Sequence, residues 1–289
     1  MIIDAHVHLY SAAVNRDPVS WAAAHGETRW AAMCLRARKD GRPVQAFPGV
    51  DNLLREMDRH GIERSVLLGW YWEKAATCTE QNTFLGQCVR THPDRLMAFG
   101  SLQPSAGQWP VLDEMHRVRD HGLIGIGELS PHAQGYSIDD PVFQEVLQLA
   151  SDWRLPVNFH VTDPETKAYP GRVETPLADF AKMARAFPRV DFILSHWGGL
   201  LPLHDASVRS LSNIYYDTAA SPLLYDTGIW ERFRAVVPTE KILWGSDYPL
   251  NLYPRDPGGV EMGRFLAEAR TAGAGDAILG GNAVRLMQI

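Results

Sequence analysis

Residues 51–69, DNLLREMDRHGIERSVLLG, contain the structural unit from which we predict the fold. Apolar residues recur at helical spacing up to His60, Gly61 follows, and the chain then enters the apolar stretch SVLLG. Glycine is favoured just past a helix because it adopts positive φ, and a histidine in the last turn suits the helix dipole. Residues 111–129 repeat this order, with a histidine and a glycine at the break. The unit is therefore a helix, a glycine stop and a short buried strand.

Eight short strands are predicted when the rest of the chain is interpreted in the same way. They cover residues 2–7, 65–69, 96–102, 123–129, 156–161, 190–196, 213–219 and 241–247. Amphipathic segments separate most of them, and strands that are apolar nearly throughout are typical of a parallel sheet covered by helices. The chain is therefore predicted to be of the α/β class, a single domain over residues 1–289 that folds as a (β/α)8 TIM barrel. A doubly wound sheet is the alternative, but no glycine-rich dinucleotide loop follows the first strand.

One connection is much longer than the others and distorts the regular order. It separates the first strand from the helix near Asp51 and includes aromatic and basic clusters around Trp21, Trp30 and Arg36. A long connection in a compact domain usually carries function, so residues 10–48 are predicted to form an insertion that acts as a lid or a partner surface. A helical insertion that only packs against the barrel is an equal alternative.

The composition limits the class of ligand and the compartment. The net charge is -6 and no block of like charges is present, which argues against nucleic acid and anionic membrane as partners. No segment approaches the roughly 18 apolar residues of a membrane span, and no signal peptide is recognised. Cys34, Cys78 and Cys88 lack metal-site spacing and predict free thiols in a reducing cytoplasm. The expected ligand is a small molecule, and a homo-oligomer is compatible with the sequence.

Polar side chains lie at the carboxyl ends of the predicted strands. In a parallel barrel these ends converge on one mouth, where active sites lie. Each residue alone would be explained by a hydrogen bond in the core or by a cap, but their coincidence indicates a shared metal site. The residues are His6, His8, Glu128, His160, His196 and Asp247.

The donor atoms of this set indicate the kind of metal. Imidazole and carboxylate without thiolate suit a borderline divalent ion, Zn²⁺ with Mn²⁺ as the alternative, and one or two ions are expected. A site with carboxylates at an open mouth has room for a water molecule, and zinc lowers the pKa of such a water to about 7. The pattern is therefore typical of a catalytic metal centre.

These residues resemble the amidohydrolase superfamily, in particular its amidohydrolase-related (amidohydrolase 2) branch of lactonases, hydratases and aminocarboxymuconate-semialdehyde decarboxylase-like enzymes. The resemblance rests on DAHVH at residues 4–8, NFH at 158–160, LSHWGG at 194–199 and LWGSDYPL at 243–250, in the expected order. It implies that His6, His8, His160 and Asp247 ligate a metal ion and that Asp247 also accepts a proton from the attacking water. His196 is then either a ligand of a second ion or a group that polarises the substrate carbonyl.

Glu128 distinguishes branches of this superfamily. Decarboxylase-like members commonly lack a carboxylate on the fourth strand, whereas TatD-like nucleases and related hydrolases have a glutamate there. The resemblance therefore implies a hydrolase with up to two ions, bridged by Glu128. The alternative is that Glu128 only hydrogen-bonds the lip of the barrel and that one ion is bound.

The implied reaction is hydrolysis of an amide or lactone in a small, carboxylated ring by metal-activated water, with Asp247 and His196 as catalytic residues. Five further residues are candidate substrate contacts. The two arginines could clamp a carboxylate or form loop ion pairs, the two aromatic residues could line a ring or pack, and the histidine follows the fourth strand. They are Arg172, Arg255, Trp197, Tyr248 and His132.

Three other functions are compatible with parts of the pattern. A non-oxidative decarboxylase on the same scaffold would hold a substrate carboxylate at the metal and release carbon dioxide. A TatD-like nuclease fits the ligand pattern, but the acidic balance and the missing basic stripe argue against it. A metal-stabilised binding protein would keep the centre without turnover.

Overall fold

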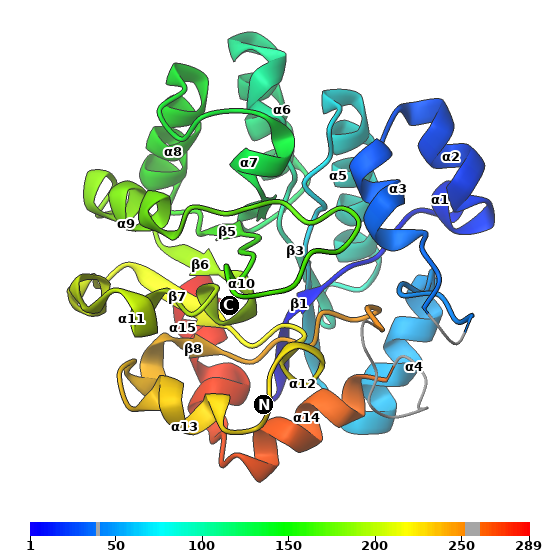
Figure 1. Ribbon diagram of the computed structural model, residues 1–289. Helices are drawn as coiled ribbons and strands as arrows, with labels where there is room; N and C mark the ends of the chain where they lie inside the picture. The colour runs from blue at the N-terminus through cyan, green and yellow to red at the C-terminus, as the bar shows by residue number, and fades with distance from the viewer. Residues whose placement is uncertain (39–40, 252–260) are drawn as a thin grey trace.

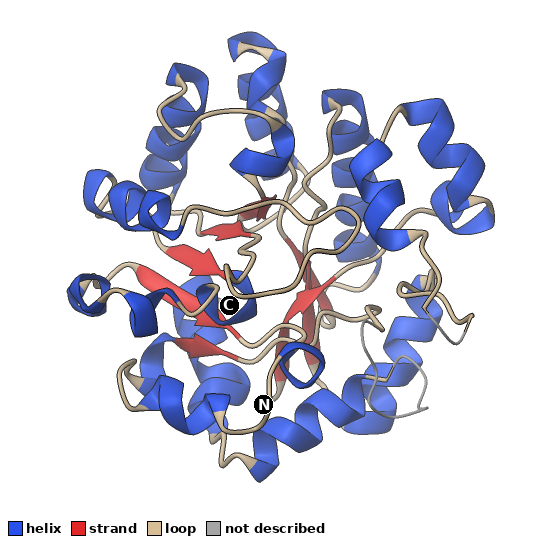
Figure 2. Cartoon of the chain, in the orientation of Figure 1, coloured by secondary structure: helices blue, strands red, loops and turns tan. Residues whose placement is uncertain are grey.

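The computed structural model describes residues 1–38, 41–251 and 261–289. In this part of the chain, eight parallel strands lie in the centre in chain order, and helices surround them (Figures 1 and 2). The strands are β1 (Ile3–Val7), β2 (Arg64–Leu67), β3 (Leu96–Ala98), β4 (Ile126–Leu129), β5 (Val157–Phe159), β6 (Phe192–Leu194), β7 (Ile214–Asp217) and β8 (Ile242–Leu243). Each overlaps its predicted stretch, so the predicted α/β barrel is confirmed.

The strands pair in two groups, β1-β2-β3 and β4-β5-β6-β7-β8. Isolated parallel bridges join the groups at both seams, Gly100 with Ile126 and Val7 with Tyr248. At the second seam the amide of Asp247 also donates to the carbonyl of His6, at 2.9 Å. The two groups are thus joined at the seams by isolated bridges and individual backbone hydrogen bonds instead of regular ladders.

The helices cover the outside of the barrel or lie at its mouth. Those that follow the insertion are α4 (Val50–His60), α5 (Ala75–Thr91), α6 (Gln108–Asp120), α7 (Pro131–Gln134), α8 (Pro141–Trp153), α9 (Leu177–Ala186), α10 (Ser195–Gly198), α11 (Leu201–His204), α12 (Ser221–Leu224), α13 (Ile229–Arg234), α14 (Met262–Thr271) and α15 (Asn282–Met287). The predicted glycine stops are present, because Gly61 directly follows α4 with a φ of 67° and Gly122 comes two residues after α6 with a φ of 74°.

Two apolar layers hold the strands in place. Alternate side chains of a strand point to opposite sides, so Leu67 and Ala98 pack in the large cluster with the outer helices, whereas Val66 and Met97 belong to a second cluster that includes residues of α15. Burial of these layers fixes the register of the strands and therefore the positions of the residues at their carboxyl ends.

The insertion after β1 contains α1 (Ala12–Arg16), α2 (Pro18–His25) and α3 (Thr28–Cys34). These helices lie beside α5 at one side of the barrel mouth (Figure 1). Trp30 is buried and packs against Tyr10 and Trp72, with ring centroids 5.4 and 5.6 Å apart. The insertion is therefore helical and packed on the barrel, as one alternative predicts, while its action as a lid stays a prediction.

Within the described residues, no helix is both long enough and apolar enough to cross a lipid bilayer. The cysteines Cys34, Cys78 and Cys88 are free and buried. Burial raises the pKa of the Cys78 thiol well above its usual range and that of Cys88 to about 11, so these two thiols are protonated at neutral pH.

Candidate metal centre

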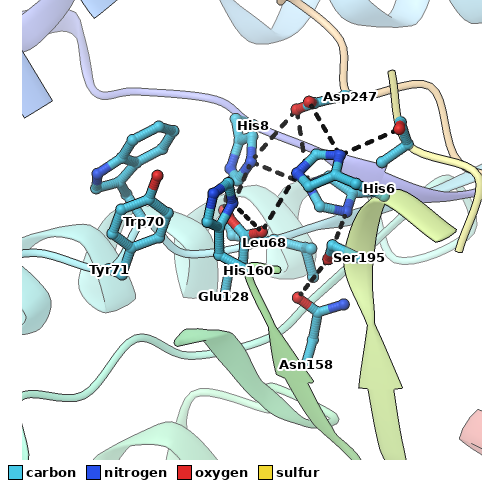
Figure 3. A network of polar contacts seen from close by, with 12 residues as sticks. His6, His8, Leu68, Trp70, Tyr71, Glu128, Asn158, His160, Ser195 and Asp247 are labelled. Atoms are coloured by element: carbon cyan, nitrogen blue, oxygen red, sulfur yellow. Dashed lines mark hydrogen bonds and ion pairs between the residues drawn. The ribbon is translucent and has the colours of Figure 1, made fainter. Parts of the chain in front are cut away.

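The six predicted ligands lie together at the mouth of the barrel, and Figure 3 labels all of them except His196. His6 belongs to β1 and His8 follows it, Glu128 belongs to β4, and His160 comes one residue after β5. His196 lies in the short helix α10 directly after β6, and Asp247 follows β8. Residues separated by up to 241 positions in the sequence thus share one site, although their binding of a metal stays a prediction.

His6 and His8 direct their Nε2 atoms toward each other, 3.1 Å apart. On the other side of each ring, the Nδ1 atom contacts an acceptor: the Asp217 carboxylate at 2.9 Å for His6 and the Leu68 carbonyl at 3.2 Å for His8. These acceptors require a proton on Nδ1, so in the neutral form of each ring the lone pair lies on Nε2. The two Nε2 atoms converge on one point, so the donor set fits a metal ion bound between them.

Both carboxylates of the centre face more than one histidine. Glu128 Oε2 lies 3.7 Å from His8 Nε2, while Oε1 lies 3.2 Å from His160 Nδ1 and 4.0 Å from His196 Nε2. Asp247 Oδ1 lies 3.7 and 3.6 Å from the Nε2 atoms of His6 and His8, and Oδ2 lies 4.0 Å from His196 Nδ1. The ligands therefore form two overlapping groups, His6–His8–Glu128 and Glu128–His160–His196.

The pKa values of the histidines in the centre are shifted in opposite directions. Burial lowers the pKa of His8 to about 3 and that of His196 to about 4, so both rings are neutral at pH 7, the form that ligates metals. Burial also opposes charge on His6, but the Asp217 carboxylate raises the pKa of His6 to about 10. Burial raises the pKa of Asp247 well above its usual range. In the metal-free protein, the raised pKa values of His6 and Asp247 favour bound protons on these two groups. A divalent cation would replace these protons as the source of positive charge in the centre.

The backbone at two ligands adopts a conformation that is uncommon for residues other than glycine. His196 and Asp247 have φ values of 57° and 65°, in the left-handed region. Nearby, a Cβ on Gly245 would lie 2.8 Å from the Cβ of His6, so only glycine allows β8 to approach β1 so closely. Residues in sparsely populated conformations concentrate at functional sites, which agrees with the position of His196 and Asp247 among the candidate ligands.

A cavity of about 600 Å³ opens above the centre. His8, Glu128, His160, His196 and Asp247 line it together with apolar residues that include Leu200, Leu223 and Leu250. The loop between β5 and α9 runs across the mouth toward α3 (Figure 1), where Gly171 lies against Met33. Three cations contribute to the wall: Arg36, Lys167 and Arg232.

A family model described as amidohydrolase matches residues 3–289. The chain belongs to the amidohydrolase family. The resemblance inferred from the sequence motifs is therefore confirmed. This family is metal-dependent, which agrees with the donor set at the mouth.

Solved structures similar to this amidohydrolase show the same fold at low sequence identity. A 5-carboxyvanillate decarboxylase from Novosphingobium aromaticivorans, complexed with manganese and 4-hydroxy-3-methoxy-5-nitrobenzoic acid, has a TM-score of 0.75, 16% identity and coverage of 100% of this chain and 96% of that one. A 4-oxalomesaconate hydratase from Rhodopseudomonas palustris has a TM-score of 0.70, 18% identity and coverage of 100% and 96%. A probable 2-pyrone-4,6-dicarboxylic acid hydrolase from Acinetobacter baumannii, with citric acid bound, has a TM-score of 0.68, 14% identity and coverage of 100% and 99%.

The two predicted aromatic contacts of this amidohydrolase are packing residues. Trp197 is 0% exposed, with its ring centroid 4.8 Å from both Trp230 and Phe233, and its indole N–H donates to Ser221 Oγ. Tyr248 is buried in the same apolar cluster. Neither residue is among those that line the cavity in the described chain, so the structure favours the packing alternative for both.

The polar candidates also have partners away from the cavity. His132 Nε2 lies 2.9 Å from an oxygen of Asp179, a residue of α9. Arg172 donates to Thr166 Oγ1 and to the Pro164 carbonyl and lies 3.9 Å from Glu174 Oε1, so its contacts are within the loop after β5, as the loop ion-pair alternative predicts. Neither side chain is among the described cavity-lining residues, and Arg255 lies outside the described residues.

Sequence reasoning missed the buried Asp217 and the aromatic wall beside the centre. Asp217 ends β7 and has the same signal as the predicted ligands, a polar residue at the carboxyl end of an apolar strand. Trp70 and Tyr71 follow β2, and their rings lie 5.3 Å from His8 and 4.9 Å from His160 (Figure 3). Nothing in the sequence distinguishes these aromatic residues from ordinary core residues.

Proposed function

We propose that this amidohydrolase is a metal-dependent hydrolase that cleaves an amide or lactone in a small, carboxylated substrate. The observation that carries the proposal is the position of Glu128 between two histidine groups, with one oxygen toward His8 and the other toward His160. A shared carboxylate of this kind supports up to two ions, Zn²⁺ or Mn²⁺. The free, buried thiols support the predicted reducing cytoplasm.

The residues of the two overlapping groups would hold the ions, with Asp247 as a further ligand. A bound divalent ion supplies an acidified water molecule and polarises a carbonyl oxygen. Asp247 accepts a proton from the water and returns it to the leaving group, because its two oxygens face both sides of the centre. His196 contributes its Nε2 atom from the wall of the cavity, where a substrate carbonyl is polarised.

The position of Arg36 supports the proposal that the substrate carries a carboxylate. Its side chain is half-buried in the cavity wall, donates through Nε to the Met33 carbonyl and lies 5.3 Å from the Tyr169 ring centroid. Among the described residues, no carboxylate lies within ion-pair distance of its guanidinium. A guanidinium binds a carboxylate through two parallel hydrogen bonds, and the three similar enzymes are named for carboxylate compounds.

Decarboxylation is the second candidate reaction. It is favoured by the likeness to the manganese-containing 5-carboxyvanillate decarboxylase and by the position of Arg36 in the cavity wall. In that reaction the centre would bind the carboxylate that is lost, and no water attack is needed. The buried Glu128 favours hydrolysis, because decarboxylase-like members commonly lack this carboxylate.

The two reactions are distinguished by their products. Protein loaded with Zn²⁺ or Mn²⁺ is incubated with a panel of aromatic acids, lactones and amides, each with a carboxylate, and carbon dioxide and ring-opened acids are measured. Hydrolysis without carbon dioxide supports the proposal, and stoichiometric carbon dioxide supports the decarboxylase. Tight metal retention without turnover on the panel supports the binding protein.

His160→Ala provides the control for this assay. The substitution removes one ligand at the mouth, so we expect loss of activity with the far-UV circular dichroism unchanged. Unaltered turnover at full metal content contradicts the ligand assignment. Elemental analysis is expected to give about one to two ions per chain, whereas a value near zero after purification without chelator favours a metal-free lactonase.

A further inference from the structure

Asp217 is fully buried at the end of β7 and contacts two of the candidate ligands from behind the centre. Its Oδ2 atom lies 2.9 Å from His6 Nδ1 and 3.4 Å from the side-chain amide of Asn158. Its Oδ1 atom accepts from the backbone amides of His196 and Ala219, both at 3.0 Å. The carboxylate therefore joins β1 and α10, the two elements that carry these histidines.

The contact with His6 determines which ring nitrogen carries a proton. An ionised carboxylate can only accept, so Nδ1 of His6 must donate to it. When the ring is neutral, Nε2 is then the atom with the lone pair, and Nε2 is the atom that faces His8 and Asp247. Ser195 Oγ, 3.3 Å from the same Nδ1, is a hydroxyl that can donate or accept, so it does not impose a tautomer by itself.

The second oxygen acts on the backbone of α10. His196 has a φ of 57°, and its ring Nδ1 donates to the carbonyl of Ala219 at 3.1 Å. Asp217 Oδ1 accepts from the backbone amides of both residues, so it holds the turn that presents His196 and the carbonyl that orients its ring. One side chain thus sets the ring of one candidate ligand and the backbone of another.

We propose that Asp217 is the positioning residue of the metal centre, which keeps His6 in the tautomer that ligates through Nε2 and holds His196 in its left-handed turn. This inference rests on the proposed metal site. Partners that orient metal-ligating histidines affect metal affinity by about 10- to 100-fold in other proteins.

Asp217→Asn tests the proposal with almost no change in shape. The asparagine oxygen remains opposite the two backbone amides, because the reverse orientation would place its NH₂ group against two donors. The NH₂ group then faces His6 Nδ1, which must become an acceptor, so the proton moves to Nε2 and the ligating lone pair is lost. We expect zinc affinity, measured by competition with a chromophoric chelator, to fall about 10- to 100-fold.

A spectroscopic measurement separates this effect from a general loss of structure. In ¹⁵N-labelled, metal-free wild-type protein, we expect His6 to show a proton on Nδ1, shifted downfield by the Asp217 carboxylate, and we expect that proton to be absent in Asp217→Asn. Glu114→Gln is the matched control, because Glu114 is a buried carboxylate that accepts from Asn82 and Thr79 and contacts no candidate ligand. It should leave both measurements unchanged.

The outcomes distinguish the inference from the function on which it rests. If the wild-type protein binds no zinc, the proposed metal-dependent function is contradicted. Zinc binding in the wild type with equal affinity in Asp217→Asn overturns the role of Asp217. If the variant does not fold, the wild-type spectrum alone decides, because an unprotonated His6 Nδ1 overturns the proposal.

Discussion

Glu128 determines how many ions the centre can hold. Its Oε2 atom faces His8 and its Oε1 atom faces His160, so each histidine group depends on the charge of this carboxylate. Burial opposes that charge, but the nearby His160, His6 and His8 hold the pKa of Glu128 well below its usual range. Glu128 is therefore ionised at neutral pH and available to a cation.

Glu128→Gln is expected to reduce the bound metal by about one ion per chain, because the amide carries no charge and offers a single acceptor oxygen. Elemental analysis after dialysis against metal-free buffer measures the effect. Glu114→Gln, which changes a buried carboxylate outside the centre, is the control. Equal metal content in Glu128→Gln and wild type would show that the carboxylate does not bridge two sites.

At the level of single residues, the sequence predicted the positions of the candidate ligands better than those of the candidate substrate contacts. A ligand such as His160 lies at the end of a strand, and the barrel itself carries strand ends to one mouth. Trp197 was predicted only by adjacency to His196, but both residues have positive φ values and the kinked backbone turns the indole into the core. Where the backbone is irregular, the position of a residue next to a candidate ligand therefore does not predict where its side chain points.

Among the elements, α3 and α5 are held together by a reciprocal pair of glutamates. Glu73, just before α5, accepts from the amide of Arg29 and the hydroxyl of Thr28 at the start of α3. The buried Glu27, just before α3, accepts from the amides of Glu73 and Lys74 at the start of α5. Glu73 thus satisfies donors in the first turn of α3, and Glu27 satisfies the two backbone amides that directly precede α5.

Glu73→Ala is expected to weaken the docking of the insertion by about 1 kcal/mol, the usual cost of a lost helix cap. Hydrogen exchange of residues 28–34 should then become about fivefold faster, as that free energy implies at room temperature. Asp58→Asn, which breaks an exposed ion pair with Arg95, is the control. Unchanged exchange in Glu73→Ala would indicate that apolar packing alone holds α3.

The regular elements were predictable and the short helices at the mouth were not. The strands and the helices that cover them follow from apolar periodicity and glycine stops, as α4 and Gly61 show. The helices α10 and α12 have four residues each, too few for a periodic pattern. They form where loops meet around the cavity, so tertiary contacts rather than local sequence determine them.

For the whole molecule, the metal is expected to contribute to stability. The candidate ligands come from both groups of strands, so an ion bound to the folded chain would join β1 to β4, β5 and β8. A ligand at about 100 times its dissociation constant stabilises the folded state by about 2.7 kcal/mol.

Removal of the metal with a chelator should therefore lower the melting temperature by about 4–5 °C, and re-addition of Zn²⁺ or Mn²⁺ should restore it. Differential scanning calorimetry of the wild type and His160→Ala measures this shift. The variant has lost one ligand, so its shift should be smaller. If the metal-loaded protein and the chelator-treated, metal-free protein had the same melting temperature, the proposed link between the two groups of strands would be contradicted.

The most direct test of the metal centre is a crystal structure of metal-loaded protein with anomalous scattering measured at the metal edge. We expect a peak between His6 and His8, about 2.0–2.1 Å from both Nε2 atoms, and a Glu128 oxygen in contact with the ion. A peak elsewhere, or loaded crystals in which these two rings bind no ion, would contradict the account.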